Sequence, residues 1–99
     1  MLESVYEACL AFELRRRGLR VETQVPVPVV YDDVTLEIGF RLDVLVEDLV
    51  IIELKSVERM EPIFQAVLQN YLRLTGKRVG FLINFNVQFF KDGIKRIVV

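Results

Sequence analysis

Two neighbouring apolar segments, Arg41–Val46 and Leu49–Lys55, constrain the fold more than any other feature of the sequence. They are separated by Glu47 and Asp48, and toward their outer ends charged residues alternate with apolar ones. Alternation with a period of two is typical of a strand that buries one face. Two strands with so short a connection pair antiparallel, since a parallel pair needs a connection of about a dozen residues or more. We therefore expect a β-hairpin here.

The hairpin has two possible registers. A two-residue turn pairs Asp43 with Ile52. A three-residue loop instead pairs Asp43 with Glu53, and in that register Arg41 lies opposite Lys55. The second register is favoured because a slip by one residue would distribute the apolar side chains over both faces. With it, six apolar side chains share one face, namely Leu42, Val44, Val46, Val50, Ile52 and Leu54.

The favoured register brings two acidic side chains together on the other face. Asp43 and Glu53 become cross-strand neighbours of like charge, which is unfavourable, and any covering of them requires a cation to keep them ionised. Lys55 points to the same face and provides one positive charge. A hard divalent cation such as Mg²⁺ provides more, and it prefers oxygen ligands. This arrangement predicts a metal-assisted hydrolase site in which Lys55 positions a water or stabilises developing charge.

A second interpretation of the same four charged residues needs no ligand. Arg41, Asp43, Glu53 and Lys55 would then form cross-strand ion pairs on a solvent-facing sheet surface. Such pairs contribute roughly 0–1 kcal/mol each. The spacing of these residues leaves both interpretations open.

The rest of the chain predicts a single domain over residues 1–99 in which two helices flank a mixed sheet. Pro26 and Pro28 place the first strand at a sheet edge or at a bend, because proline cannot donate to a ladder. The second helix is a crossover that leads most simply to a parallel neighbour, which gives an α/β (α+β) class. We expect the order α-β-β-β-α-β-β, with helices over residues 2–17 and 61–75 and strands over 21–29, 34–40 (extendable to 46), 49–55, 78–85 and 94–99.

Composition excludes several classes of site. The chain contains no histidine, which excludes histidine-based catalysis and histidine metal ligands. Cys9 is the lone cysteine, so an internal disulfide and a zinc or iron–sulfur cluster are excluded, as suits a reducing cytoplasm. No apolar run reaches the roughly 18–20 residues of a membrane span, and we expect no membrane association. The formal net charge of −1 means that any nucleic-acid role must use local charge or a metal.

Asp43 followed by Glu53-Leu54-Lys55, between two helices and a meander, resembles the PD-(D/E)xK nuclease superfamily. The segments Leu2–Tyr6 and Lys91–Arg96 look like one branch of it, a family of small proteins named for the motif GxxExxY. The likeness extends over essentially the whole chain. It implies a restriction-endonuclease-like core and metal-dependent hydrolysis of DNA or RNA.

The resemblance also implies roles for individual residues. Asp43 and Glu53 match the metal-binding acids of the superfamily, and Lys55 matches its catalytic lysine. Glu3 matches the motif glutamate of the first helix, which in related nucleases completes the metal site. Tyr6 matches the motif tyrosine and is interpreted as a core aromatic. The expected cofactor is Mg²⁺ or Mn²⁺, and because nuclease relatives often act as dimers, a homodimer is expected.

The chain departs from that family pattern in two places. The motif glycine would lie before Met1, so we expect that an N-terminal extension is lacking. In the second helix, Val67 stands where relatives carry a glutamine four residues before Tyr71, and Phe64 stands where a histidine is common. These departures bear on catalytic competence.

Two hypotheses of function follow. The first is a metal-dependent phosphodiesterase that binds nucleic acid through the local cations Lys55, Arg59, Lys77, Arg78, Lys91, Lys95 and Arg96. The second is a non-catalytic module that uses the same fold for self-association or partner binding. It is favoured by the apolar end of the last strand, since an exposed strand edge pairs readily with another chain.

Overall fold

The central hairpin has the register that the three-residue loop predicts. In the computed structural model, which describes residues 2–36 and 39–99, β4 (Arg41–Val46) pairs antiparallel with β5 (Val50–Lys55). Val46 lies opposite Val50, and Val44 lies opposite Ile52. The register that would place Asp43 opposite Ile52 is therefore wrong.

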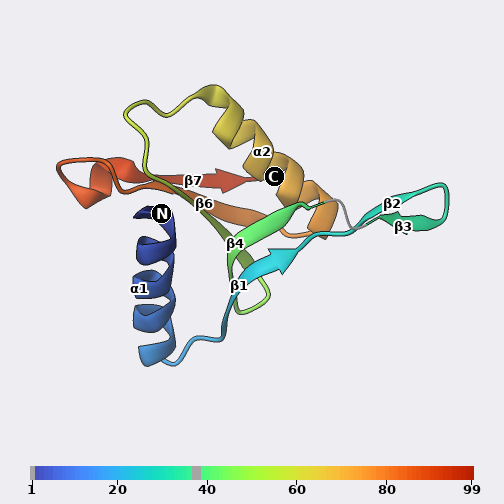
Figure 1. Cartoon of the computed structure of the whole chain (residues 1–99), viewed down its shortest axis with the longest axis horizontal. Helices are drawn as coiled ribbons and strands as arrows, with labels where there is room; N and C mark the ends of the chain where they lie inside the picture. Colours follow the sequence, from blue (N-terminus) through green and yellow to red (C-terminus); the bar gives the residue numbers. More distant parts are fainter. Residues whose placement is uncertain (1, 37–38) are drawn as a thin grey trace.

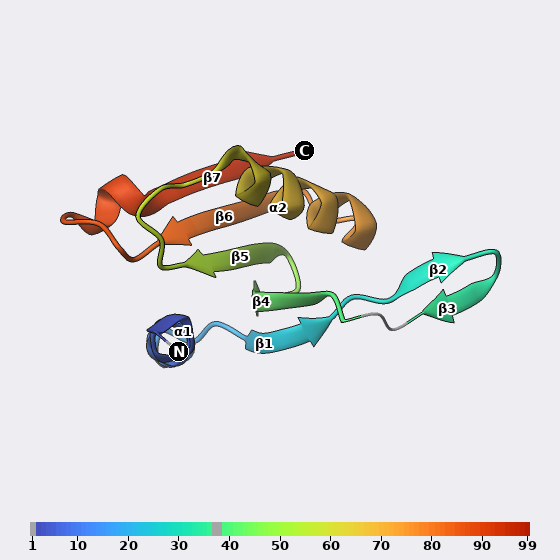
Figure 2. The same cartoon turned by 45° about the horizontal axis from the view of Figure 1, so that its top comes forward.

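Within the described residues, five strands form one mixed sheet in the order β1-β4-β5-β6-β7 (Figures 1 and 2). β5 and β6 are parallel, and the other neighbours are antiparallel. The helical crossover α2 connects the two parallel strands, as predicted. The elements around the hairpin are α1 (Leu2–Arg16), β1 (Val21–Pro26), α2 (Pro62–Thr75), β6 (Val79–Asn84), the 3-10 helix η1 (Phe90–Gly93) and β7 (Ile94–Val98).

The two helices pack on opposite faces of the sheet, so the sheet is buried on both sides. Alternate residues of β4 and β5 point to opposite faces. On one face, Val44 and Ile52 pack in a cluster that contains Ala11 of α1. On the other face, Leu45 and Ile51 pack in a cluster with Leu68 and Leu72 of α2, and these last two side chains are fully buried.

The predicted apolar face of the hairpin is wrong for one of its six residues, Leu42. Val44, Val46, Val50, Ile52 and Leu54 share the cluster on the α1 side, but Leu42 packs in the cluster on the α2 side. The strand beside it, β1, also changes the face to which its odd-numbered side chains point: Val21 packs on the α1 side and Val25 on the α2 side. The change occurs at Gln24, which has a left-handed φ of 53° between the paired positions 23 and 25. Both strands are therefore twisted beside Asp43, where regular alternation ends.

The chain between β1 and β4 differs from the two long strands that we predicted. β1 ends at Pro26, and β2 (Val29–Tyr31) and β3 (Val34–Leu36) form a separate hairpin that projects from the sheet (Figure 2). The predicted turn at Asp32 and Asp33 is confirmed, and both residues have the positive φ of a tight hairpin turn. Positions 37–38 of the predicted strand lie outside the described residues.

The register can be tested by a core substitution. Ile52→Ala should lower the free energy of unfolding by about 2–5 kcal/mol, because Ile52 is 7% exposed and packed on the α1 side. Leu49→Ala is the matched control, since Leu49 is 67% exposed in the adjacent loop. Urea unfolding followed by circular dichroism measures both. Equal losses from the two substitutions would contradict the assignment of faces.

Candidate functional site

The β4–β5 ladder ends at the pair Val44–Ile52, and two carboxylates occupy the next level. The N–H of Leu54 donates to Asp43 Oδ2 at 2.9 Å, and the N–H of Asp43 donates to Glu53 Oε1 at 3.4 Å. The side chains thus replace backbone carbonyls as acceptors. For this reason the ladder does not continue to the last predicted pairs, Leu42 with Leu54 and Arg41 with Lys55.

Glu53 is buried with its acidic neighbour and carries a strongly perturbed pKa. Glu53 is only 7% exposed. Burial and then the negative charge of Asp43 raise the pKa of Glu53 from 4.5 to about 8, against a smaller lowering by the positive charge of Lys55. The interpretation of these residues as a solvent-facing surface is therefore wrong for Glu53. Without a cation, this carboxyl holds a proton at neutral pH.

Lys55, the last residue of β5, lies on the side of the sheet that α2 covers. Its Nζ is 4.6 Å from the centroid of the Phe64 ring, a cation–π contact. Phe64 thus supports the lysine side chain from the first turn of α2. Phe64, one of the two departures noted in the second helix, is thus a contact of the predicted catalytic lysine.

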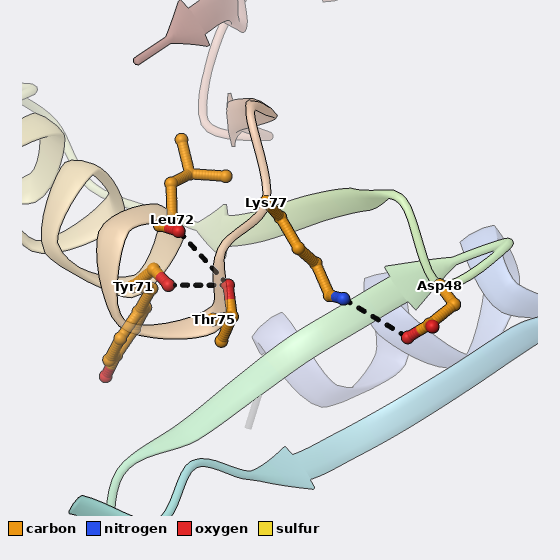
Figure 3. Close-up of polar contacts among 5 residues, drawn as sticks. All are labelled: Asp48, Tyr71, Leu72, Thr75 and Lys77. Atoms are coloured by element: carbon orange, nitrogen blue, oxygen red, sulfur yellow. Dashed lines mark hydrogen bonds and ion pairs between the residues drawn. The ribbon is translucent and has the colours of Figure 1, made fainter.

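Tyr71 is a site residue to which the sequence alone assigned no role. Burial and then the charges of Glu53 and Asp43 raise the pKa of its phenol. Phe64, Val67 and Tyr71 follow one another at helical spacing, so they lie along one side of α2. The hydroxyl of Thr75 donates to the carbonyl of Tyr71 at 2.8 Å and completes the last turn of the helix (Figure 3).

Glu3 approaches the same end of the sheet from α1. Its Oε2 accepts a hydrogen bond from the N–H of Ser56, the residue after Lys55, at 3.3 Å. In the described part of the chain, however, no three acidic or cysteine side chains gather at metal-binding distance. The structure therefore brings Asp43 and Glu53 together and leaves Glu3 on the backbone beside them. Tyr6 stacks on Phe85 with ring centroids 4.2 Å apart, the packing role that we expected of it.

A family model described as the PD-(D/E)XK nuclease superfamily matches residues 1–97. The chain belongs to this superfamily. Neither a curated protein nor a solved structure gives a significant match. The α+β fold with two helices and a mixed sheet agrees with the restriction-endonuclease-like core of the superfamily. In the described residues, no helix has the length and apolarity needed to span a membrane.

In this PD-(D/E)XK chain, a second buried polar residue holds the segment after the lysine. Asn84, at the end of β6, is 3% exposed and lies opposite Lys55 in the parallel ladder. Its Oδ1 accepts from the N–H of Val57 at 3.1 Å, and its Nδ2 donates to the carbonyl of Val57 at 2.9 Å. The only signal in the sequence is an amide at the end of an apolar strand, which does not reveal this role.

The acid pair of this superfamily member fits a divalent cation. PD-(D/E)XK nucleases generally use divalent metals. Asp43 and Glu53 provide carboxylate oxygens on adjacent strands, and each uses one oxygen to accept a backbone N–H. The pKa of Glu53 is raised first by burial and then by the negative charge of Asp43. Lys55 offsets only part of that negative charge, so an imbalance of charge remains. A hard cation at these oxygens would remove that imbalance.

The stability of the metal-free protein should decrease as the pH rises. The pKa of Glu53 is about 8 in the folded chain against 4.5 for an ordinary carboxyl, so the folded state binds this proton more tightly than the unfolded state. The free energy of unfolding should be greatest below pH 4.5 and fall between pH 4.5 and pH 8. No histidine titrates in this window, since the chain contains none.

Urea unfolding in the presence of a chelator, at pH 4.5 and at pH 8, measures the change in the free energy of unfolding. Glu53→Gln should remove most of the pH dependence, because an amide keeps the shape of the carboxyl without its titration. Glu22→Gln is the control, as it changes an exposed carboxylate on β1. A wild-type profile that is flat or rises with pH would contradict the assignment.

Proposed function

We propose that this chain is a metal-dependent nuclease, with Mg²⁺ or Mn²⁺ as cofactor, that hydrolyses phosphodiester bonds in DNA or RNA. We assign it to the GxxExxY branch of the superfamily. The observation that carries the proposal is the buried pair of Asp43 and Glu53, with Lys55 two residues further along β5. Membership of the PD-(D/E)XK superfamily supports the reaction class.

Asp43 and Glu53 are the proposed metal ligands. Their oxygens come from adjacent strands whose positions are fixed by the core on both faces of the sheet. Glu3 is the proposed third ligand, because its carboxylate already lies against Ser56 at the same end of β5. A bound divalent cation supplies a Lewis acid for the phosphoryl oxygen and lowers the pKa of a bound water.

Lys55 is the proposed catalytic lysine. It shares a sheet face with Glu53, and its positive charge acts on that carboxyl. Its ammonium is held over Phe64. Two residues further along, Val57 is fixed by its hydrogen bonds with Asn84. A lysine positioned in this way can orient the attacking water or stabilise the charge that develops on the phosphoryl group.

Metal binding should stabilise the protein by mass action. Mg²⁺ or Mn²⁺ should raise the melting temperature, because only the folded state brings the two carboxylates together. Asp43→Asn should abolish that increase. Above pH 8, where Glu53 is ionised without a metal, it should also raise the metal-free stability by removing the like-charge repulsion. Thermal melts with and without millimolar metal measure both effects. An unchanged wild-type melting temperature across this range would contradict the metal site.

Lys55→Ala should abolish cleavage and leave the fold intact. Lys55 is half-buried and has no place in either hydrophobic cluster, so its removal should act on turnover more than on melting temperature. Gel assays on labelled single-stranded, duplex and branched DNA and on RNA, with Mg²⁺ or Mn²⁺, measure turnover. The control is Arg16→Ala, which removes an exposed arginine that pairs with Glu13 on α1 at 3.3 Å. Equal activity in the two variants would contradict the role of Lys55.

Val67→Gln tests the departure in α2. If the missing amide limits catalysis, this variant should cleave faster than wild type, because position 67 lies one turn before Tyr71 on the same side of α2. If wild type and Val67→Gln are both inert on every substrate while metal still binds, catalysis is contradicted and the second candidate becomes the better one.

The second candidate is a non-catalytic module of the same fold that associates with itself or with a partner chain. It is favoured by β7, which forms an edge of the sheet in the described part of the chain. Ile94 and Val98 on this strand are 40% and 51% exposed. An edge strand with exposed apolar residues offers backbone groups for pairing with another chain.

A further inference from the structure

An apolar groove opens beside the acid pair, between α2 and the chain that enters β4. Its volume is about 430 Å³. Most of its wall is apolar, but an amide and a guanidinium also face it. The residues that form it include Phe40, Val67, Asn70, Tyr71, Arg73 and Leu74.

The groove lies near the candidate metal site. Tyr71 belongs to both, since it lines the groove and feels the charges of Glu53 and Asp43. Phe40 lies three residues before Asp43, so at most roughly 11 Å of chain separates the two Cα atoms. A polymer with one phosphodiester group at the acid pair would therefore have a neighbouring unit within reach of the groove.

The walls of the groove suit a flat aromatic ligand. Phe40 is 42% exposed, and its ring meets that of Tyr71 edge-on, with centroids 6.2 Å apart and an interplanar angle of 65°. The face of Phe40 is thus not taken up by stacking on Tyr71. Asn70 can both donate and accept hydrogen bonds at the edge of a base, and Arg73 provides a cation for a phosphate.

The low charge of the chain favours recognition by stacking. With a formal net charge of −1, contacts to phosphates alone give little affinity. Stacking of a base on an aromatic side chain contributes affinity without net charge and occurs with single strands, whose bases present free faces. Bases inside a duplex are stacked on one another and reach such a pocket only if they are flipped out.

We propose that this groove binds an unpaired nucleobase, stacked on Phe40, and that the substrate of the chain is single-stranded nucleic acid. The inference rests on the proposed function and specifies its substrate class. A second copy of the chain is a less suitable occupant. A stable protein interface involves roughly 20–30 residues on each partner. Only seven of the described residues line this groove.

The chain contains no tryptophan, so Phe40→Trp introduces a single fluorescent reporter into the groove. We would combine it with Asp43→Asn, which removes the like-charge repulsion and prevents cleavage. A short fluorescein-labelled oligothymidylate should bind, as measured by anisotropy, and an unlabelled one should quench the indole. The same oligonucleotide in a duplex should cause little quenching. Phe12→Trp in the same background is the control, since Phe12 is an exposed phenylalanine of α1.

A second pair of variants separates stacking from charge. Phe40→Leu keeps an apolar wall but removes the ring, and it should weaken single-strand binding by roughly five- to a hundred-fold. Arg73→Gln should weaken binding of single and double strands alike and reduce its salt dependence. These readouts need no catalysis. Indole quenching in the Phe40→Trp variant, together with a wild type that cleaves no substrate, would therefore support the groove while contradicting the nuclease.

Three results would overturn the proposal. The first is oligonucleotide binding that leaves the Phe40→Trp fluorescence unchanged or responds equally to the Phe12→Trp control. The second is equal binding of single strands by wild type and Phe40→Leu, which would contradict the groove while cleavage by wild type still supported the nuclease. The third is fluorescence that changes with protein concentration alone, together with dimer formation in sedimentation, which would show that a second copy fills the groove.

Discussion

The like-charge contact between Asp43 and Glu53 is the constraint around which the rest of the structure is arranged. Two carboxylates at one level of a hairpin are unfavourable for folding by themselves. Here each is offset by a backbone N–H from the neighbouring strand, which is why the regular ladder stops one level earlier. The burial of Glu53 then places its pKa near 8. The local loss of ladder bonds and the perturbed titration thus have the same origin.

The helical crossover gives this pair its surroundings. Because β5 and β6 are parallel, α2 must run back across the sheet, and it does so over the face that carries the acids. Leu68 and Leu72 fix the helix in the core. Beside them, Phe64 contacts Lys55, and the charges of the carboxylates raise the pKa of Tyr71 after the larger effect of its burial. The apolar stripe that folds the helix therefore also sets the environment of the site.

Sequence reasoning succeeded where one physical rule dominated. The alternation of charged and apolar residues selects the hairpin register, and the crossover length predicts the parallel pair. It failed where several weak effects compete, as at Gln24, whose left-handed φ interrupts the alternation of β1. At the neighbouring level, Leu42 of β4 lies on the face opposite to the predicted one. The contact of Asn84 with Val57 also depends on a tertiary approach of segments 27 residues apart, for which the sequence has no local signal.

At Glu3, a backbone N–H and the proposed metal would compete for the same carboxylate. Its carboxylate accepts the N–H of Ser56, an interaction that a surface carboxylate gains at little cost. A cation at Asp43 and Glu53 would add a second demand on that carboxylate, because hard divalent ions bind several oxygens. The hydrogen bond from Ser56 holds Glu3 at the end of β5. In the proposed metal site, the charge of the acid pair would favour a cation that competes with Ser56 for this carboxylate. The hydrogen bond would then connect the N-terminal helix to the proposed site.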